Sequence, residues 1–156
     1  MNNATPSKTL GELRDSQYTP VDIRNELRNN LIRDLRQEVD TFPDVIGYAE
    51  TVLPQLQHAI LSGHDILLLG ERGQAKTRLL RSLTNLLDDY VPYIAGCDIF
   101  DDPFNPICSR CQALTKEEGD QTKIDWLNKR DRYTEKLATP DVSMADLIGD
   151  TVSYTH

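Results

Sequence analysis

A glycine-containing turn between an apolar run and a helical pattern constrains the fold more than any other feature of the sequence. The apolar run is Ile-Leu-Leu-Leu at 66–69, and the helical pattern is Arg-Leu-Leu-Arg-Ser-Leu at 78–83. The turn at 70–77 reads Gly-Glu-Arg-Gly-Gln-Ala-Lys-Thr. A buried strand, a glycine-rich turn and a helix in this order are the context of a phosphate-binding loop.

The turn contains the residue types that phosphate binding requires. Its glycines allow backbone N–H groups to face the phosphates, and the start of the following helix adds its dipole. We expect Lys76 to reach the β- and γ-phosphates of ATP and the hydroxyl of Thr77 to bind Mg²⁺. Ala75 departs from the motif, which has glycine there, and the alternative is a polar turn that binds nothing. The predicted nucleotide-binding residues are Gly70, Glu71, Arg72, Gly73, Gln74, Ala75, Lys76 and Thr77.

These residues carry a resemblance to a known family. The turn resembles the variant loop of the MoxR-like and replicative-helicase branches of the AAA+ ATPases, and the longer run 59–73 is similar to magnesium-chelatase subunit I. Segments 42–48 and 137–150 resemble the same group in the same order. The resemblance implies a homo-oligomeric, ring-forming ATPase that remodels a partner, often one with a von Willebrand A-like domain. It also implies that Val45 and Ile46 lie beside the adenine ring, whereas from the residues alone they are an apolar start to a helix.

The sequence lacks other segments that ATP hydrolysis requires. After Thr77, no run of four apolar residues is followed by Asp-Glu, so no Walker B strand is found. Asp88 and Asp89 follow two leucines, but their helical spacing excludes them as metal ligands. We therefore expect the N-terminal portion of such an ATPase, truncated before Walker B, with hydrolysis belonging to the complete family member. The predicted fold is α/β, an incomplete three-layer sandwich of two or three parallel strands flanked by helices.

The chain divides into three predicted parts. Residues 1–18 are polar and predict a flexible lead-in. Residues 19–40 predict one amphipathic helix that starts at Thr19-Pro20 and packs on its own domain or docks on a neighbouring subunit. Residues 41–156 are the expected partial AAA+ domain. It has a helix near 52–61, strands at 65–69 and 91–96, a loop-rich insertion at 98–124 and a helix at 126–137.

Two cysteines lie in the predicted insertion, and a third directly precedes it. Cys108 and Cys111 form a C-x-x-C pair, and Cys97 lies eleven positions before Cys108. Zinc commonly takes four ligands, so a zinc site here needs a fourth from His156, an acidic residue or a residue outside the chain. Two alternatives are reduced thiols without a metal and a thioredoxin-like redox pair. The redox pair is disfavoured because Cys108 is not expected to open a helix.

The charge balance excludes some classes of function. With 17 basic and 25 acidic residues the net charge is −8, which argues against a general binder of nucleic acid or membrane surfaces. No apolar run is long enough to span a membrane, and the first residues do not resemble a secretory signal. Together with an odd number of cysteines, these features predict a cytoplasmic protein. The competing hypotheses are therefore an ATP-binding portion of an ATPase, a zinc-stabilised interaction module and a non-functional truncated fragment.

Overall fold

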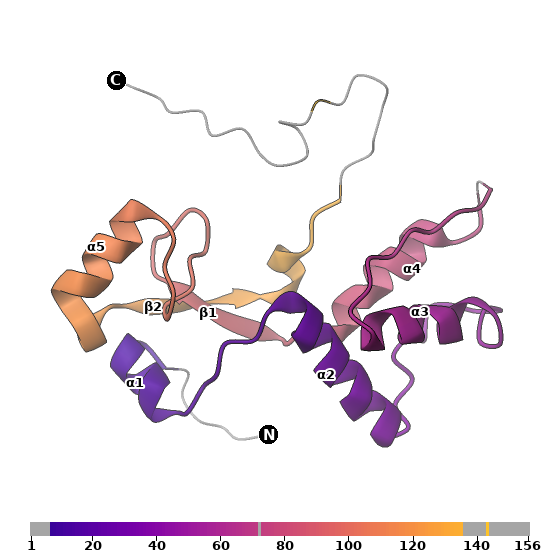
Figure 1. The fold of residues 1–156 in the computed structure, drawn as a ribbon, viewed down its shortest axis with the longest axis horizontal. Helices are drawn as coiled ribbons and strands as arrows, with labels where there is room; N and C mark the ends of the chain where they lie inside the picture. The colour runs from indigo at the N-terminus through magenta and orange to yellow at the C-terminus, as the bar shows by residue number, and fades with distance from the viewer. Residues whose placement is uncertain (1–6, 72, 136–142, 144–156) are drawn as a thin grey trace.

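The computed structural model describes residues 7–71, 73–135 and 143, and Figure 1 shows how the elements within them are arranged. The helices are α1 (Leu10–Asp15), α2 (Ile23–Arg36), α3 (Val52–Leu61), α4 (Lys76–Ser82) and α5 (Ser109–Glu118). The strands are β1 (Tyr90–Ile94) and β2 (Ile124–Asn128), and the 3₁₀ helices are η1 (Leu83–Leu86), η2 (Gly119–Gln121) and η3 (Lys129–Arg132). Of segment 137–150, which carries part of the family resemblance, only residue 143 is described.

The predicted parallel sheet is wrong. Within the described residues, the sheet has two strands, β1 and β2, which pair antiparallel from Tyr90 opposite Asn128 to Ile94 opposite Ile124. The strand predicted at 91–96 is therefore present, but its partner β2 begins at the end of the predicted insertion and overlaps the start of the helix predicted at 126–137. The charged residues around Trp126 favoured a helix. Pairing with β1 overrides that local preference and places Trp126 opposite Pro92.

The apolar run before the glycine turn is also not a strand. Residues 65–69 have no regular secondary structure, and the described part of the chain provides no strand beside them. Ile66 and Leu68 pack against the core, while Leu67 is 80% exposed and Leu69 is 83% exposed. The run therefore alternates between covered and exposed side chains and has one covered face, rather than the two covered faces of a strand inside a parallel sheet.

Helices α2, α3 and α4 surround the larger core. The members of this core come from these helices, from η1 and from the segment before α3: Leu31, Phe42, Val45, Leu56, Ile60, Leu79 and Leu86. The prediction of α3 is confirmed, including its end, where Gly63 adopts a left-handed φ of +67° after the Ser62 cap. This core holds the glycine turn between α3 and α4.

The strands, α1 and α5 form the other half of the molecule. The segment expected to be a flexible lead-in contains α1, with Leu10 and Leu13 buried. The Leu10 N–H donates to the Thr122 carbonyl (2.9 Å), and the Trp126 indole N–H donates to the Ser7 carbonyl (2.8 Å). The polar composition of residues 1–18 concealed this short helix, because only two leucines anchor it.

An aromatic cluster forms around Tyr18, which lies in the segment between α1 and α2. Tyr18 stacks on Phe104 with ring centroids 6.2 Å apart, and it meets Trp126 edge-on at 6.3 Å. Phe104 belongs to the loop between β1 and α5. The cluster therefore connects this loop to the N-terminal part of the chain.

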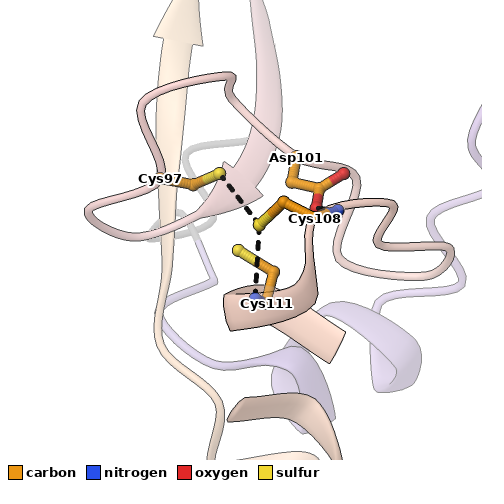
Figure 2. Close-up of side chains that lie close together, drawn as sticks. All are labelled: Cys97, Asp101, Cys108 and Cys111. Atoms are coloured by element: carbon orange, nitrogen blue, oxygen red, sulfur yellow. Dashed lines mark hydrogen bonds between the residues drawn. The ribbon is translucent and has the colours of Figure 1, made fainter. Parts of the chain in front are cut away.

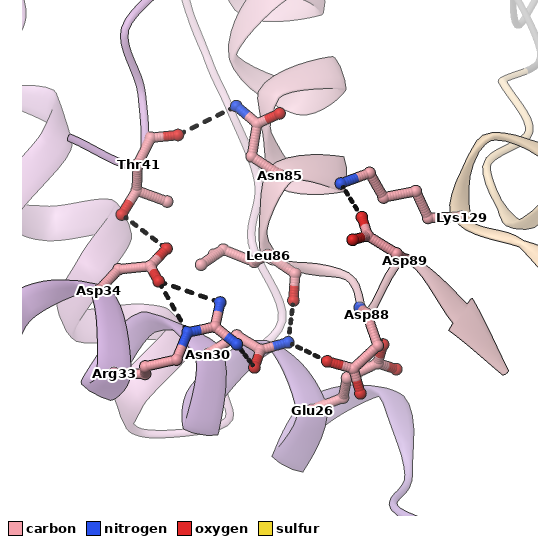
Figure 3. A network of polar contacts seen from close by, with 10 residues as sticks. All are labelled: Glu26, Asn30, Arg33, Asp34, Thr41, Asn85, Leu86, Asp88, Asp89 and Lys129. Atoms are coloured by element: carbon pink, nitrogen blue, oxygen red, sulfur yellow. Dashed lines mark hydrogen bonds and ion pairs between the residues drawn. The ribbon is translucent and has the colours of Figure 1, made fainter. Parts of the chain in front are cut away.

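Helix α2 begins later than predicted and is buried along a polar face. Its N-cap is Asp22, whose carboxylate accepts from the Arg24 and Asn25 N–H groups, so the start at Thr19-Pro20 is wrong. The helix packs on α3 and η1 of its own chain. Leu31 is buried, whereas Ile23 and Leu35 are exposed, and the polar side chains buried with Leu31 are Glu26, Asn30 and Asp34. Figure 3 shows the contacts of this polar face.

Glu26 joins the two halves of the molecule. Its carboxylate accepts from the Arg132 guanidinium (Nη1–Oε1 2.6 Å) and from the Asp88 backbone N–H (2.7 Å). Asn30, one turn later, donates to the Leu86 carbonyl (2.8 Å) and to the Asp88 carboxylate (2.9 Å). Both side chains of the Glu26–Arg132 pair are largely removed from solvent. A buried pair that loses one partner leaves an uncompensated charge in the protein interior.

We predict that Glu26→Ala lowers the free energy of unfolding by about 3–5 kcal/mol, because it leaves Arg132 buried without its carboxylate. Urea unfolding followed by circular dichroism measures the loss. The control is Asp120→Ala, which removes the exposed ion pair with Arg14 and should cost about 0–1 kcal/mol. Equal losses in the two variants would contradict the assignment of Glu26 as the joint.

Candidate functional site

Three cysteines and one aspartate converge between β1 and α5. One ligand atom from each of Cys97, Asp101, Cys108 and Cys111 lies within 4.8 Å of the others. Figure 2 shows the three sulfur atoms grouped beside the Asp101 carboxylate. The four side chains come from a turn after β1, from the following loop and from the start of α5, so the cluster is formed by tertiary structure.

Local backbone geometry places Cys97. Gly96, with φ of +70°, turns the chain after β1, and the Cys97 N–H donates to the Ile94 carbonyl (3.1 Å). The turn continues to Phe100, whose N–H donates to the Cys97 carbonyl (3.2 Å). The N–H groups of Asp101 and Ile99 face the Cys97 sulfur. Such donors stabilise a thiolate and are typical of the outer shell of thiolate metal sites.

The other two cysteines sit at the start of α5. Cys108 is the N-cap of this helix, and its sulfur accepts from the Cys111 N–H (3.3 Å). The sequence predicted a loop here, so the expectation that the C-x-x-C pair does not open a helix is wrong. The polar residues after Cys111 gave only a weak helical pattern, which is why the sequence concealed α5.

Asp101 holds the loop that leads into α5. Its side chain is 4% exposed, and its carboxylate oxygens accept from the N–H groups of Ile107 and Cys108, each at 2.9 Å. Burial raises the pKa of this carboxyl, but the N–H donors outweigh burial and bring the pKa below its ordinary value. Asp101 is therefore negatively charged at neutral pH beside three sulfur atoms.

The thiols differ in how readily they ionise. Burial raises the pKa of Cys97, but the N–H groups of Asp101 and Ile99 and the neighbouring thiols bring it below its ordinary value. Burial and the adjacent Cys108 and Cys97 sulfurs raise the pKa of Cys111 to about 12. Several negative charges cannot accumulate in this space without a cation. A divalent metal supplies that charge and displaces the remaining thiol protons.

The distances suit a tetrahedral metal. Zinc binds sulfur at about 2.3 Å, so two sulfurs of one tetrahedral site lie about 3.8 Å apart. The sulfurs of Cys97 and Cys108 are 4.0 Å apart, close to that separation. The cluster can therefore bind a metal such as zinc with small side-chain movements. The sequence predicted three possible sources of a fourth ligand: His156, an acidic residue or a residue outside the chain. The structure places an acidic residue, Asp101, in the cluster. His156 lies outside the described residues.

The glycine turn lies at the other end of the molecule, beside a cavity of about 210 Å³. The cavity is lined by residues from the segment before α3, from α3, from residues 67–69 and from the turn, including Val45, Tyr48, Gln74, Ala75 and Lys76. Ile46 is not among the lining residues and is 86% exposed. Of the two predicted base contacts, the structure thus brings Val45 alone to the turn. Arg72 lies outside the described residues.

Lys76 is held inside the turn. Its ammonium donates to the Gly70 carbonyl (2.8 Å) and to the Glu71 carbonyl, while the Glu71 N–H donates to the Gln74 side chain (3.0 Å). Ala75 adopts a left-handed φ of +54°. Glycine adopts this conformation more readily than other residues, which explains why the motif has glycine at this position. Thr77 is exposed in the first turn of α4. Among the described residues of the turn, the Lys76 ammonium is therefore held by two backbone carbonyls.

Asp88 and Asp89 are engaged in structural contacts. The Asp88 carboxylate accepts from Asn30, and Asp89 forms an ion pair with Lys129 (2.7 Å) (Figure 3). Both residues lie between η1 and β1, outside the helix on which the sequence placed them.

Comparisons with known proteins provide no relative. No family model matches the chain, and neither a curated protein nor a solved structure matches it. The resemblance to AAA+ ATPases therefore stays a prediction. Within residues 7–71, 73–135 and 143, none of the helices has the length and apolar composition needed to cross a bilayer.

We predict that Asp101 stabilises the metal-free protein in a pH-dependent way. Because its pKa is lowered by folding, its contribution is present above the ordinary aspartate pKa and is lost as the pH falls through the lower folded value. With a chelator present, Asp101→Asn should cost about 1–2 kcal/mol at pH 6 and progressively less below pH 4. Urea unfolding at a series of pH values measures this difference.

The control for this prediction is Asp98→Asn, an exposed aspartate in the same turn. Its effect on stability should be small at every pH. A cost of Asp101→Asn that stays constant down to pH 3 would show that the carboxylate charge does not hold the loop.

Proposed function

We propose that the chain is a zinc-binding interaction module, in which one zinc ion held by Cys97, Asp101, Cys108 and Cys111 fixes the segment between β1 and α5. The observation that carries this proposal is the approach of four ligand atoms to within 4.8 Å. The ligands lie between residues 97 and 111, with Cys97 and Cys111 at the two ends of this span and Asp101 and Cys108 in its interior. A metal bound there closes the loop at both ends.

The ligand types favour zinc in a structural role. Thiolates select zinc over magnesium and calcium, which prefer oxygen ligands. Four protein ligands complete a tetrahedron, so the set has no open position for a substrate. The burial of Cys97 and Cys111 supports the same role.

The loop held by the metal has the composition of a contact surface. Between its first and last cysteine it exposes three large apolar side chains: Ile99, Phe100 and Ile107. Exposed apolar side chains gathered on one loop are typical of surfaces that contact another protein. Zinc would keep this loop in one conformation and so reduce the entropy lost when a partner binds.

We predict that purified reduced protein binds one zinc ion per chain, and that Cys108→Ser loses it. Zinc at about 1,000 times its Kd should add about 4 kcal/mol of stability and raise Tm by about 10 °C. Elemental analysis gives the stoichiometry, and thermal unfolding with and without a chelator gives the shift. Cobalt(II) should give the thiolate charge-transfer and d–d absorption of a tetrahedral site.

Ser109→Ala is the matched control, because it changes the residue next to Cys108 and keeps all four ligands. It should bind zinc as the natural sequence does. Absence of stoichiometric metal from a folded, reduced protein would refute the proposal, as would equal zinc binding by the Cys108→Ser variant.

A second proposal is that residues 70–77 bind the phosphates of Mg-ATP. It is supported by the cavity that Val45, Tyr48 and Lys76 line together. Lys76 would exchange its two carbonyl partners for the β- and γ-phosphates, and Thr77 would bind Mg²⁺. Hydrolysis, ring assembly and a von Willebrand A-like partner belong to this proposal, because the resemblance alone implies them. The parallel sheet of such ATPases is not part of it.

We predict that titration calorimetry with Mg-ATP detects micromolar binding that Lys76→Ala abolishes, because the substitution removes the cation in the turn. Lys116→Ala is the control, since it removes an exposed lysine from α5 at the other end of the molecule. Unchanged heat with Lys76→Ala would place the binding elsewhere. No heat with the natural sequence would show that the turn does not bind ATP.

A further inference from the structure

Two of the three sulfur atoms are placed to react with each other. The Cys97 and Cys108 sulfurs are 4.0 Å apart, although the residues are eleven positions apart in sequence. Figure 2 shows the two side chains pointing toward one another from opposite sides of the loop. A disulfide has a sulfur–sulfur bond of about 2.05 Å, so the atoms must approach by about 2 Å.

The backbone at both residues allows this approach. Cys97 lies in a turn outside β1, and Cys108 is an N-cap with extended φ and ψ of −77° and 143°. Cys111, in contrast, is inside the first turn of α5, and its own N–H donates to the Cys108 sulfur. Rotation of the Cys97 and Cys108 side chains therefore gives up the capping bond from the Cys111 N–H to the Cys108 sulfur, but no backbone–backbone hydrogen bond of α5.

Access to solvent distinguishes the three thiols. Cys97 and Cys111 are buried, at 5% and 0% exposure, whereas Cys108 is partly exposed. A small dissolved oxidant therefore reaches the Cys108 sulfur first. Once Cys108 is oxidised, the Cys97 sulfur is a thiol within 4.0 Å and on the buried side.

We propose that the cluster is a peroxide-sensitive switch, in which the metal-free form closes a Cys97–Cys108 disulfide that excludes zinc. This inference rests on the zinc site proposed above. The Cys108 thiolate attacks one peroxide oxygen, the O–O bond breaks, and hydroxide leaves with the electron pair, which gives a sulfenic acid. The Cys97 thiolate then attacks the Cys108 sulfur and expels its oxygen as a second hydroxide. Overall, two thiols and hydrogen peroxide give one disulfide and two waters.

The disulfide and the metal are mutually exclusive. Two of the three thiolate ligands are consumed by the bond, and Cys111 with Asp101 cannot complete a tetrahedral site. Conversely, zinc engages the lone pairs that attack peroxide, so bound metal protects the thiols. At zinc concentrations about 100 times Kd the metal-free fraction is about 1%, so disulfide formation should slow about 100-fold.

The tryptic map of this chain identifies the linked pair directly. Lysine and arginine are absent between Arg81 and Arg110, so Cys97 and Cys108 fall in one peptide, 82–110. Cys111 falls in the next peptide, 111–116. A Cys97–Cys108 disulfide is therefore internal to one peptide, whereas any bond to Cys111 joins two peptides.

The experiment treats two samples of the full chain with hydrogen peroxide, one containing zinc and the other a chelator. Free thiols are then blocked with N-ethylmaleimide under denaturing conditions, and the protein is digested with trypsin. In the metal-free sample we expect peptide 82–110 to be unlabelled and lighter by two hydrogen atoms, and peptide 111–116 to carry one maleimide. With zinc, both peptides should be fully labelled. A thiol reductant should reverse the bond and restore zinc binding.

Other products overturn the inference. These are a cross-link between the two peptides, sulfinic acid on Cys108 without a disulfide, or oxidation at the same rate with and without zinc. The Cys111→Ala variant should still form the internal disulfide. If this variant does not fold, the peptide map of the natural sequence shows which two cysteines are linked. Zinc binding without a disulfide refutes the switch alone. If the reduced protein binds no zinc, the metal site is refuted, and the switch is refuted with it even when peroxide forms the disulfide.

Discussion

The buried carboxylate of Glu26 holds together two halves whose buried apolar clusters are separate among the described residues. On one side lie α2, α3, α4 and their common core, and on the other lie the two-stranded sheet, α1 and α5 (Figure 1). Glu26 receives a guanidinium from η3 and a backbone N–H from the segment that enters β1. Because a carboxylate is buried only when its charge and its lone pairs are satisfied, the position of α2 fixes where β1 begins. The polar face of α2 is therefore the contact that orders the molecule, and its exposed Ile23 and Leu35 are peripheral.

The two candidate sites lie in different halves and depend on different physics. The metal cluster needs thiolates close together, and the structure supplies N–H donors, burial and a fixed carboxylate for them. The turn at 70–77 needs backbone N–H groups free to meet phosphates, and one of these, at Glu71, is directed to the Gln74 side chain. The cluster thus concentrates negative charge that a bound cation would neutralise. In the turn, the Lys76 ammonium is already bonded to backbone carbonyls of the turn itself. This contrast favours metal binding at the cluster over phosphate binding at the turn.

The sequence predicted individual elements better than their pairing. The spacing of Leu56 and Ile60 identified α3, and the three cysteines were recognised as candidate ligands without any structure. The parallel sheet failed because the run at 66–69 has the composition of a buried strand, yet half of its side chains remain exposed. Asp101 was missed as a member of the cluster because it is one of three aspartates after Cys97, and only folding selects it by placing the N–H groups of Ile107 and Cys108 on its oxygens. Long-range pairing of this kind leaves no periodic trace in a sequence.

The aromatic cluster gives the loop between β1 and α5 an optical reporter. Trp126 is the only tryptophan of the chain, and Tyr18 lies between it and Phe104 of the loop. A movement of Phe104 therefore alters the packing of Tyr18 and, through it, the surroundings of the indole ring. Because the indole N–H also holds the Ser7 carbonyl, the same movement affects the anchor of the N-terminal segment. The intrinsic fluorescence of this protein consequently reports the state of a loop that contains no fluorophore of its own beyond phenylalanine.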